Sequence, residues 1–215
     1  MSELILEYYD QLKNSVINGK QEDAIDLTNQ LIQLNTKPQD VIDYALLKGM
    51  EIVGERFREQ KIFVPHVLIA ARAMKSAMSI LNPLIADDKS NSKGTVLLGT
   101  VKGDVHDIGK NLVGVMIEGA GYKVVDIGTG KTAEDFYEEY KKVSPNVIGL
   151  SALLTSTMTY MKEVITFFRE QDSEVPIIVG GAPVTKKFAE EIGASAFGRN
   201  SYEAVKIVDE LIGVS

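Results

Sequence analysis

The sequence contains no cysteine and no tryptophan, and its 215 residues include only two histidines, His66 and His106. Without cysteine the chain can form no disulfide, thiolate nucleophile, iron–sulfur cluster or cysteine-based zinc site. Any chemistry that needs an imidazole must therefore use His66 or His106. The lack of cysteine also favours an intracellular location.

Strongly basic segments and long apolar runs are missing as well. The chain has 23 basic and 30 acidic residues, a net charge of −7, and the two signs are interleaved. We expect no nucleic-acid partner, because binding to phosphates needs a basic surface. The apolar runs fall short of the roughly 20 residues that cross a bilayer, and residues 1–7 lack a signal-peptide pattern. The sequence therefore predicts a cytoplasmic protein with no membrane partner.

Residues 1–86 have the pattern of a four-helix bundle. Apolar residues recur at every third or fourth position in four segments between Ile5 and Leu84. Asn18-Gly19 closes the first segment, and Pro38 lies near the start of the third. The short connections predict that the four helices pack antiparallel.

A different pattern begins after a polar linker at residues 87–94 and fills residues 95–215. Short apolar runs, each followed by a turn and a helical segment, lie at 95–98, 123–125, 147–150 and 176–179, with a weaker fifth run at 194–197. This alternation predicts an α/β domain with a doubly wound, parallel, five-stranded sheet. Ligands of such sheets bind beyond the carboxyl ends of the strands, so the loops after the strands are where we expect a site.

The loop after the first predicted strand contains an aspartate, a histidine and a glycine in the pattern D-x-H-x-x-G: Asp104, His106 and Gly109. The two-residue spacing lets the Asp104 carboxylate fold back onto one ring nitrogen of His106, which leaves the other nitrogen free for a metal. Gly109 permits close approach of a bulky group. Taken alone, the pattern is equally typical of a hydrogen-bonded loop histidine.

Two later strand ends carry further motifs. The third predicted strand ends in Ser151-Ala152-Leu153 and is followed by Thr155 and Thr157, and the fourth ends in Gly180-Gly181. Neither motif indicates a function alone. Three motifs on successive strand ends, behind a helical domain, together favour one shared binding site.

These motifs resemble those of the cobalamin-binding proteins that carry a methyl group between methyltransferases, including the corresponding module of cobalamin-dependent methionine synthase. The resemblance covers residues 1–215 and is densest at 99–120 and 149–157. It implies a helical cap at 1–86, followed by a Rossmann-like (flavodoxin-like) cobalamin-binding domain at 95–215.

In that family a protein histidine replaces the cofactor's own dimethylbenzimidazole base below cobalt. The resemblance implies that His106 is this cobalt ligand and that Asp104 hydrogen-bonds its other ring nitrogen. Thr157 stands where the family places a hydroxyl behind the aspartate. The detached tail of the cofactor would enter a slot between two strand-end turns, lined by Ser151, Leu153, Thr155, Gly180 and Gly181.

The helical cap of the family shields the upper, methyl-bearing face of the corrin. Phe63, Val67 and Met74 are candidates for that shield here, although apolar residues at helical spacing more often belong to a core. His66 is expected at the surface or in the cap and not as a second ligand.

The sequence departs from the family pattern at two places. The family usually has glycine where a helix ends before the Ile62-Phe63-Val64-Pro65 segment, and this chain has Gln60. A left-handed conformation at Gln60 would cost about 1 kcal/mol. The second departure is the loop at 128–131, which stands where the family often has a Val-Pro pair after the second strand.

The resemblance implies a methyl carrier that is not a catalyst alone. A substrate-specific methyltransferase would transfer a methyl group from a methoxylated aromatic, a methylamine, methanol or a similar donor to cob(I)alamin. A second methyltransferase would pass the group from methylcobalamin to an acceptor such as tetrahydrofolate or a thiol, and a reductive activase would restore oxidised cobalt. The sequence leaves the donor and the oligomeric state open.

Three alternatives share parts of the pattern. The cobalamin-binding subunit of an adenosylcobalamin mutase has D-x-H-x-x-G but mostly lacks the helical cap. A cobalamin-dependent light or ligand sensor has both domains and usually adds a basic DNA-binding segment. A domain with a vestigial motif is the third alternative.

Overall fold

The structure is a computed structural model that describes residues 3–84 and 92–213. The chain divides into two compact units, residues 1–91 with 119–121, and residues 92–118 with 122–215. The predicted linker at 87–94 lies mostly outside the described residues, so the predicted domain boundaries stay predictions. Within the described part, no helix is both long and apolar enough to cross a membrane.

Helices make up the first unit, as the apolar spacing predicts. They are α1 (Glu3–Ile17), α2 (Gln21–Gln33), α3 (Pro38–Val41), η1 (Ile42–Leu46), α4 (Leu47–Arg58), α5 (Val64–Leu81) and η2 (Asn82–Leu84). The third predicted helix is thus a continuous run of α3, the π-helical turn η1 and α4. Helix α1 contacts α2, α4 and α5, and α2 also contacts α5, so the buried apolar stripes meet in one helical core.

The parallel sheet of the second unit is confirmed. Its strands are β1 (Thr95–Thr100), β2 (Lys123–Asp126), β3 (Val147–Ser151), β4 (Ile177–Gly180) and β5 (Ala196–Gly198), in the order β2-β1-β3-β4-β5. Thr100 pairs with Ser151, and Ser151 pairs with Gly180. The carboxyl ends of β1, β3 and β4 therefore lie side by side, which brings the three sequence motifs to one edge of the sheet.

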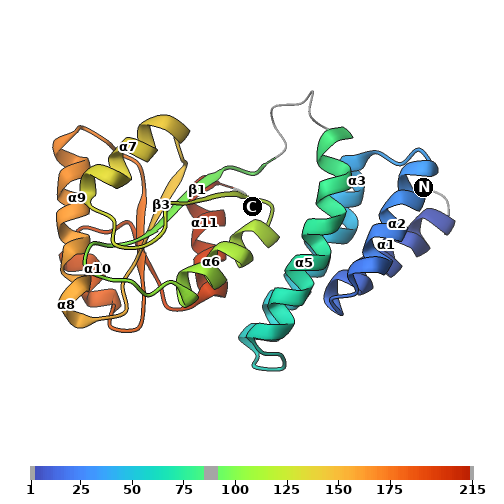
Figure 1. Ribbon diagram of the computed structural model, residues 1–215, viewed down its shortest axis with the longest axis horizontal. Helices are drawn as coiled ribbons and strands as arrows, with labels where there is room; N and C mark the ends of the chain where they lie inside the picture. Colours follow the sequence, from blue (N-terminus) through green and yellow to red (C-terminus); the bar gives the residue numbers. More distant parts are fainter. Residues whose placement is uncertain (1–2, 85–91, 214–215) are drawn as a thin grey trace. The chain divides into compact units, whose positions relative to one another are not determined.

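Helices cover both faces of this sheet. Figure 1 shows α6 (Ile108–Gly119) and α11 (Ser201–Ile212) on one side of the sheet, and α7 (Ala133–Val143) and α9 (Tyr160–Glu170) on the other. Two short helices, α8 (Thr155–Met158) and α10 (Lys186–Glu191), also belong to this unit. Side chains of Thr132, Thr185 and Asn200 accept hydrogen bonds from the first turns of α7, α10 and α11. These are the residue types that favour a helix start.

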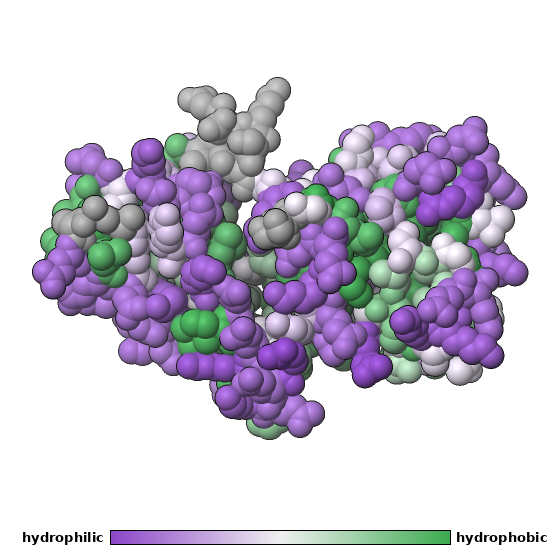
Figure 2. All heavy atoms as spheres, turned by 180° about the vertical axis from the view of Figure 1, so that it is seen from behind, coloured by the Kyte–Doolittle hydropathy of each residue, from purple (hydrophilic) through white to green (hydrophobic). Residues whose placement is uncertain are grey.

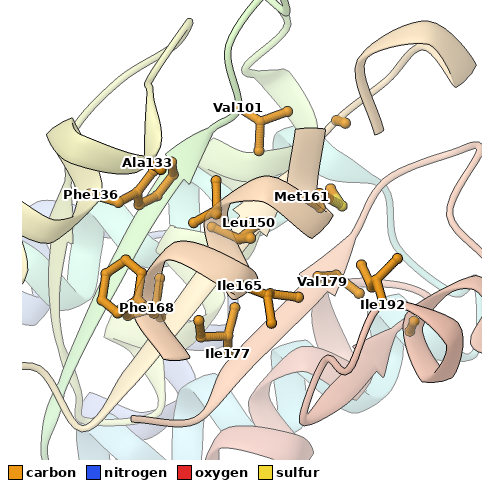
Figure 3. Packing of buried hydrophobic residues seen from close by; sticks show 14 of the residues in the cluster. Val101, Ala133, Phe136, Leu150, Met161, Ile165, Phe168, Ile177, Val179 and Ile192 are labelled. Atoms are coloured by element: carbon orange, nitrogen blue, oxygen red, sulfur yellow. The ribbon is translucent and has the colours of Figure 1, made fainter. Parts of the chain in front are cut away.

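One hydrophobic core of the second unit lies between the sheet and the helices α7, α9 and α10 (Figure 3). Phe136 from α7, Phe168 from α9 and Ile177 from β4 are fully buried there. The ring centroid of Phe168 lies 5.4 Å from that of Tyr137 and 5.4 Å from that of Tyr140, with edge-to-face geometry in both pairs. Most of the face shown in Figure 2 is hydrophilic, as expected for a chain with 25% charged residues.

Just after the end of helix α4, Gln60 has the left-handed conformation, at the position where the family usually has glycine. Its φ angle is 59°, and its N–H donates to the carbonyl oxygen of Phe57 at 3.0 Å. The next N–H, of Lys61, donates to the carbonyl oxygen of Arg56 at 2.9 Å. The backbone thus satisfies the last carbonyl groups of the helix at the expense of an unfavourable φ angle for a residue with a Cβ.

Replacing Gln60 with glycine should stabilise the protein. Glycine removes the steric strain of the positive φ angle, while the larger freedom of the unfolded chain offsets part of the gain. We expect the free energy of unfolding, measured by urea titration with circular dichroism, to rise by up to about 1 kcal/mol. Gln60→Ala, which keeps a Cβ, is the matched control and should give no gain; equal stability of both variants would contradict the prediction.

Candidate cofactor site

The loop after β1 folds the carboxylate of Asp104 onto His106. Asp104 is fully buried, and its N–H donates to the carbonyl oxygen of Val101 at 3.1 Å. Its Oδ1 accepts from the backbone N–H of His106 at 3.0 Å and lies 2.7 Å from Nδ1 of the same residue. This is the contact that the two-residue spacing predicts.

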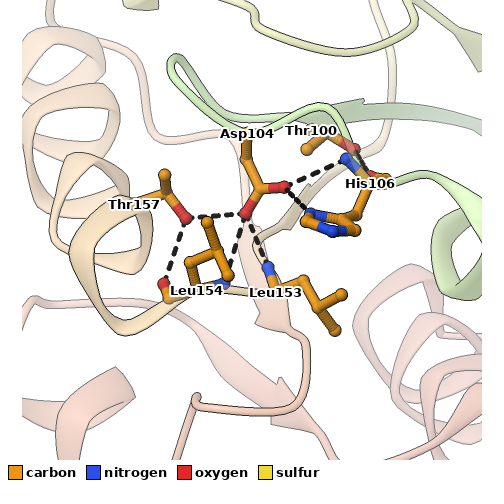
Figure 4. Close-up of polar contacts among 6 residues, drawn as sticks. All are labelled: Thr100, Asp104, His106, Leu153, Leu154 and Thr157. Atoms are coloured by element: carbon orange, nitrogen blue, oxygen red, sulfur yellow. Dashed lines mark hydrogen bonds and ion pairs between the residues drawn. The ribbon is translucent and has the colours of Figure 1, made fainter.

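The second oxygen of the carboxylate is held from the loop after β3 (Figure 4). Oδ2 accepts from the backbone N–H of Leu153 at 2.7 Å and of Leu154 at 3.3 Å. It also accepts from the Thr157 hydroxyl, in α8, at 2.6 Å. Thr157 therefore stands behind Asp104, at the place that the family resemblance implies.

These contacts decide which nitrogen of His106 is free. Burial alone would raise the pKa of Asp104, but the hydrogen bonds from Thr157, Leu153 and His106 outweigh burial and hold that pKa well below its usual range. Asp104 is ionised at neutral pH, and an ionised carboxylate only accepts hydrogen bonds. Nδ1 of His106 therefore carries a proton, and Nε2 is the ring nitrogen that could bind a metal, on a side chain that is 47% exposed.

The two later motifs lie next to each other at the same edge of the sheet. The N–H of Ala152 donates to the carbonyl oxygen of Gly180 at 3.3 Å. Gly181 has a φ angle of 129°, and a Cβ there would stand 1.8 Å from the carbonyl oxygen of Ala152. Only glycine permits this approach of the two turns. The structure thus brings Ser151-x-Leu153 and Gly180-Gly181 together.

Three predicted site residues lie at the solvent-exposed side of the loops. Gly109 is in the first turn of α6, and outside its own helix and chain neighbours no atom of the described residues comes within 4 Å of its ideal Cβ position. Thr155 is exposed at the first residue of α8, and Leu153 is 44% exposed. All three leave space for a ligand.

The candidates for the shield on the helical unit divide into two kinds. Phe63 precedes α5 and is 66% exposed, whereas Met74 is 6% exposed and Val67 is fully buried. Burial favours the packing role for Met74 and Val67, so the shield proposal rests on Phe63. His66 is exposed, as expected, and its Nδ1 accepts from the N–H of Phe63 at 3.3 Å.

Comparisons with known proteins match both halves of the chain. Two family models, each described as a B12 binding domain, match residues 8–82 and 94–206. A corrinoid protein of Desulfitobacterium hafniense (strain Y51) is 38% identical over 98% of this chain and 100% of its own length. The chain belongs to the B12-binding corrinoid proteins.

Further relatives of this corrinoid protein indicate its functional class. A dimethylamine corrinoid protein of Methanosarcina barkeri is 38% identical over 96% of this chain and 98% of its own length. The solved methanol:cobalamin methyltransferase complex MtaBC of Methanosarcina barkeri has a TM-score of 0.88 and 31% identity, over 97% of this chain and 81% of that chain. The cofactor is cobalamin, and the chain is a methyl-carrying corrinoid protein of a methyltransferase system. The mutase and sensor alternatives are not favoured.

The residues of the corrinoid protein fit that cofactor. The donor set fits because no described residue forms a hydrogen bond with Nε2 of His106, and the ring is oriented by a carboxylate. Two apolar residues near His106, Val105 in the loop and Ile108 at the first position of α6, are 76% and 81% exposed and suit the apolar surface of a macrocycle. At the start of α11, the buried Oγ of Ser201 has no hydrogen-bond partner among the described residues. A polar group of a ligand would satisfy this hydroxyl, which is otherwise unfavourable.

Sequence reasoning missed several of these groups. The backbone N–H groups of Leu153 and Leu154 have no residue-specific signature, because any residue except proline supplies the same donor. Ser201 lies in a helix start, where a serine is ordinary. Val105 and Ile108 could have been found, since apolar residues in an otherwise polar loop are a signal of a covered surface.

Gly181→Ala should open the edge of the sheet that holds the two turns. The methyl group would overlap the Ala152 carbonyl, so β3 and β4 must separate at their ends. Gly193→Ala is the matched control, because Gly193 has a φ angle of 75° and, among the described residues, no atom outside its chain neighbours lies within 4 Å of its Cβ position. We expect the control to lose about 1–2 kcal/mol of stability and to bind cobalamin normally, and Gly181→Ala to lose more stability and bind at least about 10-fold more weakly. Urea unfolding and cobalamin titration test this, and equal losses in both variants would contradict the clash.

Proposed function

We propose that this chain receives a methyl group on its bound corrinoid from a substrate-specific methyltransferase and delivers it to an acceptor methyltransferase, with His106 as the lower ligand of cobalt. The observation that carries the proposal is the imidazole of His106, with Nδ1 bonded to a buried, ionised carboxylate and Nε2 free. When bound, the cofactor supplies the chemistry, because its cobalt accepts and releases the methyl group.

The role of Asp104 is to keep His106 in one tautomer and one orientation. Its carboxylate accepts the Nδ1 proton, which increases the electron donation of Nε2 to a metal. Thr157 and the N–H groups of Leu153 and Leu154 stabilise the charge of that carboxylate. With a proton on Nδ1 facing Asp104, Nε2 is the nitrogen that would bind cobalt.

The slot at the ends of β3 and β4 is the proposed site of the detached nucleotide tail. Contact between the turns at Ala152 and Gly181 gives a backbone-lined wall with little side-chain bulk. The exposed apolar side chain of Leu153 would cover the base, and the unpartnered Ser201 hydroxyl would meet a polar group of the tail. The remaining proposed lining residues are Ser151, Thr155 and Gly180, with Gly109 beside the corrin.

The helical residues 1–86 are the proposed cover of the upper face of the corrin, joined by the linker at 87–94 to the cobalamin-binding residues 95–215. Phe63 is the proposed shield residue, because its ring is two-thirds exposed at the start of α5. An apolar ring over the cobalt side of the cofactor would exclude water from the methyl group.

Partners and donor follow from the relatives. MtaBC is a methanol:cobalamin methyltransferase complex, and other relatives are dimethylamine and trimethylamine corrinoid proteins. These names support a small methylated donor, methanol or a methylamine, activated by a separate methyltransferase. We also propose a second methyltransferase for the acceptor, a reductive activase for oxidised cobalt, and a cytoplasmic location.

The ligand assignment can be tested by electron paramagnetic resonance of the Co(II) form. Protein reconstituted with one equivalent of cobalamin should show superhyperfine splitting from one nitrogen, and 15N labelling of histidine should change that splitting. His106→Ala should remove the protein-nitrogen splitting. His66→Ala is the matched control, because it replaces the other histidine of the chain, and should leave the spectrum unchanged. Splitting that ignores the histidine label would disprove the assignment.

The carrier role can be tested by loading the reduced protein with a methyl group. The Co(I) form should accept a methyl group from methyl iodide and from one member of a panel of methyltransferases supplied with methanol, monomethylamine, dimethylamine or trimethylamine. Mass spectrometry of the extracted cofactor measures the yield of methylcobalamin. Failure with methyl iodide, together with tighter binding of adenosylcobalamin than of methylcobalamin, would contradict the carrier role.

A further inference from the structure

Thr100, the last residue of β1, contacts the histidine loop from a direction that the Asp104 network does not use. Its side chain is fully buried, and its Oγ1 donates to the carbonyl oxygen of His106 at 2.9 Å. Figure 4 shows Thr100 beside the main chain of His106, away from Thr157 and the β3 loop. The contact joins the end of a central strand to the residue that carries the imidazole.

The position of Thr100 is itself fixed by its neighbours in the sheet. It pairs with Ser151 of β3, and its N–H donates to the carbonyl oxygen of Gly128 at 2.9 Å. Its carbonyl oxygen accepts from the N–H of Lys131 at 2.9 Å. The loop at 128–131, which departs from the family pattern, is thus bonded to both main-chain groups of Thr100. The side chain of Thr100 therefore extends from a main chain that hydrogen bonds hold on both sides.

The hydroxyl completes the restraint of His106. Asp104 Oδ1 fixes the N–H of His106 and its Nδ1, and Thr100 Oγ1 fixes its carbonyl oxygen. Both main-chain groups and one ring nitrogen are therefore held, and the direction of Nε2 follows from them. Without the hydroxyl, the His106 carbonyl would lose this buried donor and the main chain could rotate.

We propose that Thr100 is a positioning residue for the axial ligand: its hydroxyl locks the main chain of His106 and thereby sets the strength of the bond between Nε2 and cobalt. The inference rests on the proposed function, since it takes His106 as the ligand. Groups that orient a ligating histidine commonly change metal affinity by about 10-fold to 100-fold when they are removed.

Thr100→Val, which removes the hydroxyl and keeps the shape, tests the proposal. The equilibrium between histidine-bound and histidine-free Co(II), measured by the fraction of spins with protein-nitrogen splitting, should shift about 10-fold toward the free form. The Co(II)/Co(I) midpoint potential should become less negative, because histidine stabilises Co(II) and does not bind Co(I). In the apo protein, 15N spectra of the labelled imidazole should show increased exchange between tautomers or orientations.

Thr28→Val is the matched control. Thr28 is also fully buried, and its Oγ1 donates to the carbonyl oxygen of Ala24 at 2.7 Å within α2. Thr28→Val removes the same kind of hydrogen bond from the helical unit, so it should change neither the nitrogen splitting nor the midpoint potential. Thr100→Ser keeps the hydroxyl and should show the wild-type splitting and potential. If Thr100→Val does not fold, a comparison of Thr100→Ser with Thr100→Ala isolates the effect of the hydroxyl.

The outcomes separate the two proposals. Wild-type splitting and potential in Thr100→Val, or an equal effect of Thr28→Val, would overturn the positioning role while His106 remains the ligand. A wild-type spectrum that does not respond to the histidine label would instead overturn the proposed function, whatever the Thr100 variants show.

Discussion

The site depends on one buried charge, the carboxylate of Asp104. Burial in a protein interior disfavours such a charge, and five hydrogen bonds from His106, Leu153, Leu154 and Thr157 stabilise it here. These donors come from two loops about fifty residues apart in the sequence. The same charge that joins the loops also holds a proton on Nδ1 of His106. One carboxylate therefore sets both the local fold and the orientation of the imidazole.

Neighbouring elements reinforce this arrangement without touching the carboxylate oxygens. Lys110, in the first turn of α6, is buried and forms an ion pair with Asp126 at the end of β2. Asp126 also accepts from the N–H of Gly128 at 2.8 Å, and the carbonyl oxygen of Gly128 accepts from Thr100. The segment that carries His106 is therefore anchored at both of its ends. The loop at 128–131 takes part through the N–H and carbonyl oxygen of Gly128 and the N–H of Lys131, and a proline at either position would remove its N–H donor.

The proposed roles of protein and cofactor account for the few reactive side chains in the sequence. In the proposed function cobalt would supply the methyl chemistry, and the protein would hold and orient the cofactor. Its proposed contribution is the orientation of one imidazole, a slot with a backbone-lined wall at Ala152 and Gly181, and the exposed apolar side chains of Val105 and Ile108. The absence of cysteine and the scarcity of histidine fit this role, since one correctly placed imidazole is sufficient.

The sequence by itself determined the order of the helices and strands and the contact between Asp104 and His106. Apolar periodicity predicted the helices of the first unit, short apolar runs predicted the five strands, and D-x-H-x-x-G placed Asp104 beside His106, because each pattern depends on neighbours along the chain. Tertiary structure decided the rest. The donors from Leu153 and Leu154, the approach of Gly181 to Ala152 and the hydroxyl contact of Thr100 exist only once the parallel strands are in register, which no local pattern contains. Burial likewise separated exposed Phe63 from buried Met74, because periodicity gives the apolar face of a helix and not what covers it.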